Sequence, residues 1–163
     1  MVHVASQVAA PGDVLVIAAE TTRAVTWGEL LTENAVERGL EGVVTAGNVR
    51  DAAVLADSDF PVFAAAISQA GAAKETPGAV NVPVSVGGVV VTPGDVVVGD
   101  RDGVTVVPRA EAEAVLDSAD KRAEREAEVR ERIAAGETLF DIGGYDEKLE
   151  ALGGPSLGSN GDD

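Results

Sequence analysis

Residues 42–51 read Gly-Val-Val-Thr-Ala-Gly-Asn-Val-Arg-Asp. A short valine run bounded by glycine is typical of a buried strand, and this one predicts a strand over residues 42–45. Glycines on both sides of the run allow the chain to turn sharply where the strand ends. Arg50 and Asp51 then emerge at the carboxyl end of that strand, which is the usual place for a binding site in an α/β sheet.

Similar valine-rich runs occur along the centre of the chain, and two of them follow Pro-Gly-Asp turns at residues 11–13 and 93–95. Gly87-Gly88 predicts a tight hairpin, and residues 100–103 predict a second turn of similar kind. The centre of the chain is therefore expected to be mostly β. The further strands predicted in this way cover residues 14–17, 62–65, 82–86, 89–91, 96–98 and 104–107.

A first main helix is predicted from Thr26 to Gly39. Thr26 and Glu29 have the spacing of a capping box, in which the threonine caps the helix and the glutamate reaches back to it. One side of the predicted helix is apolar. That side carries Trp27, Leu30, Leu31 and Ala35. Residues 1–10 resemble the end of a shorter helix that leads into the Pro11 turn.

A second main helix is predicted from about Arg109 to Ala135. It is densely charged over residues 121–132, so we expect it to lie on the outside and to reach a neighbouring subunit. Its apolar stripe is Ala112, Val115, Leu116, Ala119 and Ala123. Residues 1–152 are interpreted as a single domain, and the polar, glycine-rich residues 153–163 as a disordered acidic tail.

The composition excludes several classes of function. The 163 residues carry 12 Lys and Arg against 28 Asp and Glu, a net charge of -16, which disfavours nucleic-acid partners. No cysteine is present, and His3 is the single histidine, so thiol chemistry, a Ser-His-Asp triad and a zinc finger are not expected. No apolar run approaches the length of a membrane span, and no cationic signal peptide opens the chain, which predicts a cytoplasmic protein without a membrane partner.

The cations are nine Arg and three Lys. Acidic excess and scarce lysine indicate a halophilic host, in which high salt screens the repulsion between like charges. An acidic protein from an ordinary cytoplasm is the alternative.

Arg50 and Asp51 suggest a site for an anion together with a metal ion. The Arg50 guanidinium and the amides of Leu30 and Leu31 could hold a carboxylate. Asp51 and Glu29 could hold a hard divalent cation through oxygen. Two alternatives stay open from the residues alone: a structural ion pair at Arg50-Asp51, and a capping role for Glu29.

The order of short motifs between about residues 8 and 140 resembles the family of regulator-of-ribonuclease-activity-A-like (RraA-like) proteins and 4-hydroxy-4-methyl-2-oxoglutarate aldolases. As in those aldolases, twenty residues separate an acidic residue, here Glu29, from an Arg-Asp pair. The resemblance implies the α/β swivelling β/β/α fold, an αββα sandwich. The motifs that carry it are Pro11-Gly12-Asp13, Trp27-Gly28-Glu29-Leu30-Leu31, Gly47-Asn48-Val49-Arg50-Asp51, Phe60-Pro61-Val62, Val82-Pro83-Val84, Gly87-Gly88-Val89, Pro93-Gly94-Asp95, Asp100-Arg101-Asp102-Gly103 and Glu126-Ala127-Glu128.

The same resemblance implies a role for each candidate residue. Asp51 would bind Mg²⁺ or Mn²⁺, and Glu29 would hold a metal-bound water. Arg50 and the backbone of Gly28, Leu30 and Leu31 would hold the pyruvyl part of a small 2-oxoacid substrate. Glu126 of an adjacent subunit, with Glu128 as its competitor, would complete the site within a homotrimer or hexamer.

The reaction implied is metal-dependent cleavage of 4-hydroxy-4-methyl-2-oxoglutarate-type substrates to pyruvate, with oxaloacetate decarboxylation at the same site. A Schiff-base mechanism is disfavoured, since Lys74, Lys121 and Lys148 all lie in loop-like or charged segments rather than at an apolar strand end. The alternative function is a non-catalytic, ribonuclease-inhibitor type of binding protein. The methyltransferase label that some relatives carry is rejected for lack of a glycine-rich cofactor loop after a strand.

Three departures from the family pattern bear on catalysis. Val54 stands where many relatives carry an acidic residue, and Ala18-Ala19-Glu20-Thr21 replaces a glycine-rich turn. Relatives usually carry a longer segment before the first Pro-Gly-Asp turn. Without that segment, apolar faces of the sheet are expected to be exposed and the chain to be prone to aggregation.

Overall fold

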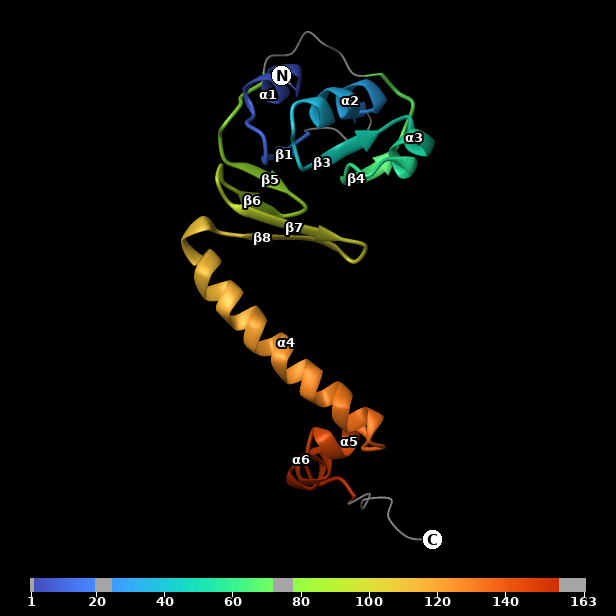
Figure 1. The fold of residues 1–163 in the computed structure, drawn as a ribbon, viewed down its shortest axis with the longest axis vertical. Helices are drawn as coiled ribbons and strands as arrows, with labels where there is room; N and C mark the ends of the chain where they lie inside the picture. Colours follow the sequence, from blue (N-terminus) through green and yellow to red (C-terminus); the bar gives the residue numbers. More distant parts are fainter. Residues whose placement is uncertain (1, 20–24, 72–77, 156–163) are drawn as a thin grey trace. The chain divides into compact units, whose positions relative to one another are not determined.

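The structure is a computed structural model that describes residues 2–19, 25–71 and 78–155. It divides the chain into two compact units, Met1–Ala112 and Glu113–Asp163, called here the first and second unit. Figure 1 labels the elements in chain order. Those of the first unit are α1 (Val2–Val8), β1 (Val14–Ile17), β2 (Val25–Trp27), α2 (Glu29–Glu37), β3 (Gly42–Val49), α3 (Ala52–Asp57), β4 (Val62–Ile67), β5 (Val84–Val86), β6 (Val89–Val91), β7 (Val96–Asp100), β8 (Gly103–Val107) and the 3-10 turn η1 (Arg109–Glu111).

Strand β3 is the centre of a parallel sheet. It pairs with β1 along its first half, with β2 along its second half, and with β4 along its other edge. Every residue of β3 except Ala46 is buried. A strand covered on both faces favours small and apolar residues in succession rather than an alternating pattern, and residues 42–49 supply these except at the buried polar residues Thr45 and Asn48. The predicted strand at 42–45 is confirmed, and it extends four residues further.

The core of the first unit lies between this sheet and the helices. The Trp27 ring stacks on Phe60, with centroids 6.4 Å apart and planes 10° from parallel. Trp27 Nε1–H donates a hydrogen bond of 2.7 Å to Thr32 Oγ1 on α2, which satisfies its polar atom inside the core. The buried apolar cluster consists of Trp27, Ala35, Leu40, Val43, Val49, Leu55 and Phe60.

Helix α1 is fastened to α2 by polar contacts. Arg38 Nε donates to Ser6 O at 2.7 Å, and Arg38 Nη2 donates to Gln7 O at 2.8 Å, so one guanidinium satisfies carbonyls at the end of α1. The buried Ser6 hydroxyl donates to Asn34 Oδ1 at 2.9 Å. The helix predicted within residues 1–10 is confirmed.

The capping box predicted at Thr26 is wrong. Thr26 lies in strand β2, and helix α2 begins at Glu29 after Gly28, with no side-chain cap from Gly28. The pairing of β2 with β3 outweighs the local capping preference, because Trp27 gains a buried position through it. Leu30 was expected on the apolar side of the helix, yet its side chain is 71% exposed.

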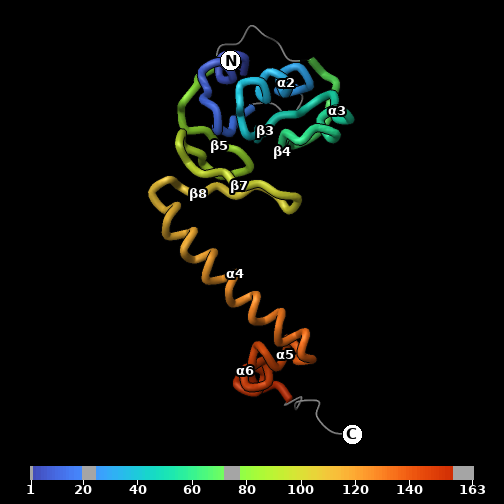
Figure 2. The backbone as a smooth tube through the Cα atoms, viewed as in Figure 1, coloured from blue at the N-terminus to red at the C-terminus, as the bar shows by residue number. Residues whose placement is uncertain are grey.

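Two antiparallel hairpins complete the first unit. Hairpin β5–β6 turns at Gly87 and Gly88, both at positive φ, and hairpin β7–β8 turns at residues 100–103, as predicted. Figure 2 shows both hairpins beside the parallel sheet. Valines of the sheet and of both hairpins enclose a small apolar cavity of about 150 Å³. Its lining is Val16, Val44, Val86, Gly87, Val89, Val91, Val97, Val104 and Val106.

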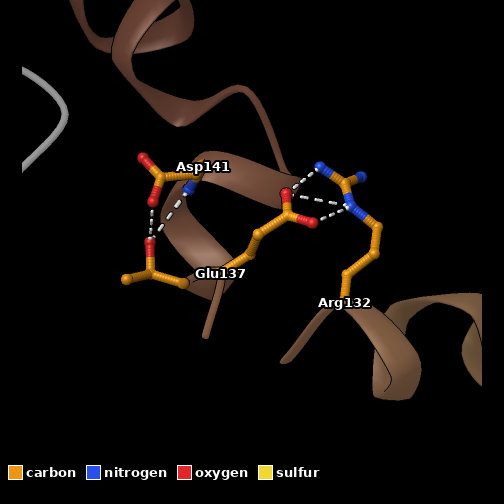
Figure 3. A network of polar contacts seen from close by, with 4 residues as sticks. Arg132, Glu137 and Asp141 are labelled. Carbon is orange, nitrogen blue, oxygen red and sulfur yellow. Dashed lines mark hydrogen bonds and ion pairs between the residues drawn. The ribbon is translucent and has the colours of Figure 1, made fainter. Parts of the chain in front are cut away.

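The second unit is helical. Helix α4 (Ala112–Ala134) confirms the second main helix of the prediction, and two short helices follow, α5 (Leu139–Ile142) and α6 (Tyr145–Ala151). Figure 3 shows the turn after α4, where the Arg132 guanidinium pairs with Glu137, and where Thr138 and Asp141 bond to each other. Polar contacts therefore bridge this turn.

Some predictions fall on parts of the chain that the structure does not describe. Residues 156–163 of the predicted tail lie outside the described residues, as does Lys74. Among the helices that the structure describes, none is long and apolar enough to cross a lipid bilayer.

Candidate functional site

The carboxyl ends of β2 and β3 meet at one edge of the sheet. Trp27, the last residue of β2, is the register partner of Val49, the last residue of β3. The Arg50 N–H donates to Trp27 O at 3.1 Å, which holds Arg50 beside the segment that follows β2. Gly28 and Arg50 therefore lie together where parallel strands end, in agreement with the sequence-based prediction of the site.

Asp51 is held in an uncommon backbone conformation. Its φ is 58° and its ψ is 35°, in the left-handed region that non-glycine residues rarely adopt. Its Oδ2 accepts a hydrogen bond of 3.1 Å from the Glu29 N–H and lies 3.3 Å from Arg50 Nε. The carboxylate of Asp51 therefore caps the first turn of α2 across 22 residues of sequence, a place where negative charge is favoured.

Gly28 provides the room for this approach. A Cβ atom at Gly28 would lie 2.8 Å from Asp51 Oδ2 and 2.9 Å from Arg50 Cγ. Both distances are closer than side chains normally come, so any other residue at this position would displace the Arg50-Asp51 pair. The family resemblance implies a role for Gly28 in substrate binding, and the structure adds this steric role.

The first turn of α2 presents backbone donors at the same edge. The first intrahelical bond runs from Thr32 N to Gly28 O, so the amides of Leu30 and Leu31 precede it and have no acceptor within the helix. Glu29 is only partly buried, and the side chains of Arg50 and Asp51 are 51% and 31% exposed. An anion could reach this turn from solvent and meet both the amides and the guanidinium.

A threonine network below the site was not predicted. The hydroxyls of Thr26 and Thr45 are 2.8 Å apart, and Thr45 Oγ1 accepts a bond from the Gly47 N–H at 3.0 Å. Thr26 Oγ1 also donates to the backbone oxygen of Asn48 at 3.2 Å. These bonds lie where the pairing of β3 with β4 shifts in register, between Thr45 and Asn48, just before the strand ends and Arg50 follows. Because the two threonines are nineteen residues apart, no local sequence pattern predicts that they bond to each other.

Glu126 belongs to the second unit, on α4. Arg122 Nε donates to Glu126 Oε1 at 2.8 Å, and Arg130 Nη2 donates to Glu126 Oε2 at 3.3 Å. The hydrogen bond from Arg122, followed by its positive charge, lowers the pKa of the Glu126 carboxyl. Glu126 is thus an ionised carboxylate held between two arginines of its own helix, and Glu128 is exposed.

The arrangement in the first unit can bind an anion beside a carboxylate. Within the residues that the structure describes, no three His, Cys, Asp or Glu side chains gather as a metal cage. Asp51 and Glu29 are oxygen donors of the kind that Mg²⁺ and Mn²⁺ prefer, and Mg²⁺ commonly takes only one or two carboxylates and keeps several waters. The two carboxylates therefore suit such a metal as part of its ligand set, and waters would supply further ligands.

Comparison with known proteins settles the family. The RraA-like family, described as Aldolase/RraA, matches residues 1–106. The chain belongs to the RraA-like family. A relative from Halalkalibacterium halodurans, named "Putative 4-hydroxy-4-methyl-2-oxoglutarate aldolase", is 41% identical over 143 residues, which cover 86% of this chain and 67% of the relative.

Solved RraA-like structures share the fold. The Streptomyces coelicolor protein RraAS2, described as an unusual member of the RNase ES inhibitor RraA protein family, superposes with a TM-score of 0.74 and 33% identity. The RNA-processing inhibitor RraA from Thermus thermophilis superposes with a TM-score of 0.59 and 34% identity. The matches cover 80% and 66% of this chain and 67% of each of those chains. The predicted α/β RraA-like fold is confirmed, and the chain spans about two thirds of the length of these relatives.

Three further residues bear on the chemistry of an RraA-like site. Val54, named in the sequence analysis as a departure from the family pattern, is 47% exposed on α3 and offers no ligand. Lys121 and Lys148 belong to the second unit, where Lys148 Nζ donates to Gly143 O at 2.7 Å and lies over the Tyr145 ring. Neither lysine has the apolar surroundings that a Schiff-base nucleophile needs.

Proposed function

We propose that this RraA-like protein is a divalent-metal-dependent aldolase that cleaves 4-hydroxy-4-methyl-2-oxoglutarate-type substrates to pyruvate, with oxaloacetate decarboxylation as a side activity. One observation supports the proposal most. A guanidinium, a carboxylate and two amides without helical acceptors are gathered at the carboxyl edge of a parallel sheet. These groups match the needs of a 2-oxoacid, which carries a carboxylate beside a carbonyl.

Arg50 and the first turn of α2 would hold the substrate. The guanidinium of Arg50 and the N–H groups of Leu30 and Leu31 are donors for the substrate carboxylate and for the oxygen on which negative charge develops. When the carbon–carbon bond of the aldol substrate breaks, the hydroxyl group gives its proton to water and becomes the carbonyl of the second product, while the electron pair of the broken bond moves into the adjacent carbonyl and forms the enolate of pyruvate. With oxaloacetate the group that leaves is carbon dioxide, and in both reactions the enolate takes up a proton from water to give pyruvate. Donors that are already oriented stabilise that charge without a costly rearrangement.

Asp51 and Glu29 would hold the divalent metal, Asp51 directly and Glu29 through a water. Mg²⁺ or Mn²⁺ acts as a Lewis acid that stabilises negative charge on oxygen. Asp51 contributes by its fixed position, since the Glu29 N–H and Arg50 both hold Oδ2.

The remaining acidic group would come from α4 of an adjacent subunit in a homotrimer or hexamer. Glu126 is the first candidate and Glu128 the second. Both carboxylates lie on the partly exposed or exposed surface of α4, so a neighbouring copy could receive either of them.

The test is a pair of substitutions at Asp51. Asp51→Asn keeps an oxygen that can accept the Glu29 N–H, and asparagine tolerates positive φ, so we expect native stability. Its metal-dependent release of pyruvate, from oxaloacetate and from the aldol substrate in high salt, should fall by at least about a hundredfold. Asp51→Ala should lose the same activity and also about 1 kcal/mol of stability, because the helix cap is removed. Full activity in a folded Asp51→Asn protein would contradict the proposal.

A non-catalytic binding protein is the second candidate. It is favoured by Val54, which follows the Arg50-Asp51 pair on α3 and offers no metal ligand. If the native protein releases no pyruvate with Mg²⁺ or Mn²⁺ at any salt concentration, while remaining folded and assembled, this candidate replaces the aldolase.

A further inference from the structure

Strand β4 ends at the same edge of the sheet as β2 and β3. Val49, the last residue of β3, is the register partner of Ile67, the last residue of β4. The Ser68 N–H donates to Val49 O at 2.9 Å, so the pairing continues one residue beyond β4. Gly28, Arg50 and Ser68 therefore follow one another along this edge, each just after the end of its own strand.

The segment after β4 is fixed at both edges of β3. Beyond Ser68, Ala70 O accepts the N–H of Val25 at 3.1 Å, and Val25 belongs to β2, which pairs with the other edge of β3. The segment thus runs from the β4 side of the sheet to the β2 side. Because backbone bonds hold it on each side of β3, Ser68 has a set position beside Arg50, as a group that recognises a ligand requires.

The Ser68 hydroxyl retains its proton for a further acceptor. Its Oγ accepts a hydrogen bond of 3.2 Å from the Ala70 N–H, and the residue is partly buried. A serine hydroxyl has one proton to donate and two lone pairs that accept, and the bond from Ala70 occupies one lone pair. A partly exposed hydroxyl at this edge can donate that proton to an anion, which is the stronger kind of hydrogen bond.

The groups assigned to the oxoacid end and to the metal lie on the Gly28 side of Arg50. Asp51 Oδ2 accepts the Glu29 N–H, and a Cβ atom at Gly28 would lie 2.8 Å from that oxygen. The side of Arg50 toward β4 has no role in the proposed function so far. A substrate held at its oxoacid end has this side open for its remaining carbons, and Ser68 is the polar residue that lies there.

We propose that Ser68 is a specificity-determining residue, whose hydroxyl donates to the second carboxylate of a 2-oxo dicarboxylic acid. The inference rests on the proposed function and extends it, since no group has yet been assigned to that carboxylate. It names the substrate class more narrowly. The preferred substrates carry a carboxylate at each end, and 2-oxoacids with an apolar end bind more weakly.

This assignment separates the two proposed reactions. The second carboxylate of the aldol substrate is bonded to the carbon that becomes a carbonyl, and it keeps its charge throughout the cleavage. The second carboxylate of oxaloacetate lies one carbon nearer the oxo group, and it loses its charge as carbon dioxide departs. A donor at Ser68 therefore stabilises the aldol substrate from binding to product, whereas it does not assist the decarboxylation.

The first experiment measures binding to the full chain by isothermal titration calorimetry, with Mg²⁺ in high salt. The probes are 2-oxoglutarate and 2-oxopentanoate, which share the oxoacid end and the length of the carbon chain, and only the former has a second carboxylate. The native protein should prefer 2-oxoglutarate, and Ser68→Ala should weaken that binding by about tenfold. Binding of 2-oxopentanoate should stay unchanged. Ser68→Thr keeps a hydroxyl and should keep the preference.

Ser58 provides the matched control. Its Oγ accepts the N–H of Phe60 at 3.1 Å, the same local bond, two residues along the chain, that Ser68 makes with Ala70. Ser58 precedes β4, so it lies at the opposite end of that strand. Ser58→Ala removes the equivalent turn bond and should leave the affinity for both probes unchanged. An equal loss of 2-oxoglutarate binding in Ser58→Ala and Ser68→Ala would show a general structural effect and contradict the assignment.

The second experiment compares pyruvate release from the two substrates. In Ser68→Ala, the KM for the aldol substrate should rise by about tenfold with little change in kcat, while both constants for oxaloacetate stay near their native values. An unchanged preference between the two probes, or an unchanged ratio of the two activities, would overturn the proposal. If the native protein releases no pyruvate while Ser68 still sets the preference between the probes, the proposed function fails and the assignment of Ser68 stands.

Discussion

Strand β3 and helix α4 are stabilised by different kinds of interaction. All but one of the eight residues of β3 are buried, and it has paired strands on both edges. None of the 23 residues of α4 is buried, and its ion pairs join Arg122 and Arg130 to Glu126 on its own surface and Arg132 to Glu137 in the following turn. Burial stabilises the first segment, whereas the second relies on local contacts that are weak in water.

This difference separates two kinds of substitution. A change next to β3 should alter the free energy of unfolding, because packed neighbours cannot rearrange freely to fill a gap. A change on α4 should alter association between copies far more than folding. The site residues Arg50 and Asp51 lie where the well-packed segment ends, which keeps them positioned while their side chains remain accessible.

The largest expected effect comes from Trp27→Ala. Its side chain is 1% exposed, stacks on Phe60 and donates to Thr32, so its removal leaves a cavity and takes one buried hydrogen bond from the Thr32 hydroxyl. We expect a loss of about 3–5 kcal/mol in the free energy of unfolding, measured by urea denaturation. Val115→Ala on α4 is the control, with little expected change in the same measurement at concentrations where copies are dissociated. Equal losses in the free energy of unfolding for the two variants would show that the buried and the exposed segment contribute alike to folding.

A smaller effect is expected from Val97→Ile. Val97 lines the cavity of about 150 Å³ between the sheet and the hairpins, so the added methylene enters apolar space. Stability should rise by up to about 0.8 kcal/mol, measured as a shift in the urea midpoint. Val98, its neighbour on β7, is 56% exposed, and Val98→Ile should leave the midpoint unchanged. A lower midpoint for Val97→Ile would show that the cavity cannot accept the extra group.

The smallest effect is expected at the turn after α4. A hydrogen bond from Arg132, followed more weakly by its charge, lowers the pKa of the Glu137 carboxyl. Because the folded pKa is the lower one, this contact stabilises the turn above the ordinary glutamate pKa, and the contribution is lost as the pH falls through the lowered value. In Arg132→Gln, an NMR titration of Glu137 should move upward, while that of Glu126 should stay in place. An unchanged Glu137 titration would show that the pair does not persist in water.

The sequence predicts the strands of this fold better than it predicts the start of α2. Valine runs between turn residues mark β1, β3 and the hairpins, because buried strands need apolar residues in succession. Strand β2 has three residues and no such run, and it forms through its pairing with β3. A threonine three residues before a glutamate therefore indicated a helix cap where the chain forms a strand.

For the candidate site, the sequence predicts the place but not the geometry. A strand end followed by Arg50 and Asp51 is a local pattern, and the structure confirms their position at the sheet edge. The bond from the Glu29 N–H to Asp51 depends on a positive φ and on the missing side chain of Gly28, and both depend on contacts between distant segments. The roles in catalysis remain predictions until the Asp51 variants are assayed.

The position of Trp27 makes this protein its own optical probe. It is the single tryptophan of the chain, it is buried, and its backbone oxygen accepts the Arg50 N–H directly beside the candidate site. Emission excited at the indole therefore reports on the first unit alone, without an attached dye. Titration with 2-oxoacids or divalent cations can be followed through a change in that emission, and events confined to the second unit remain silent in the same signal.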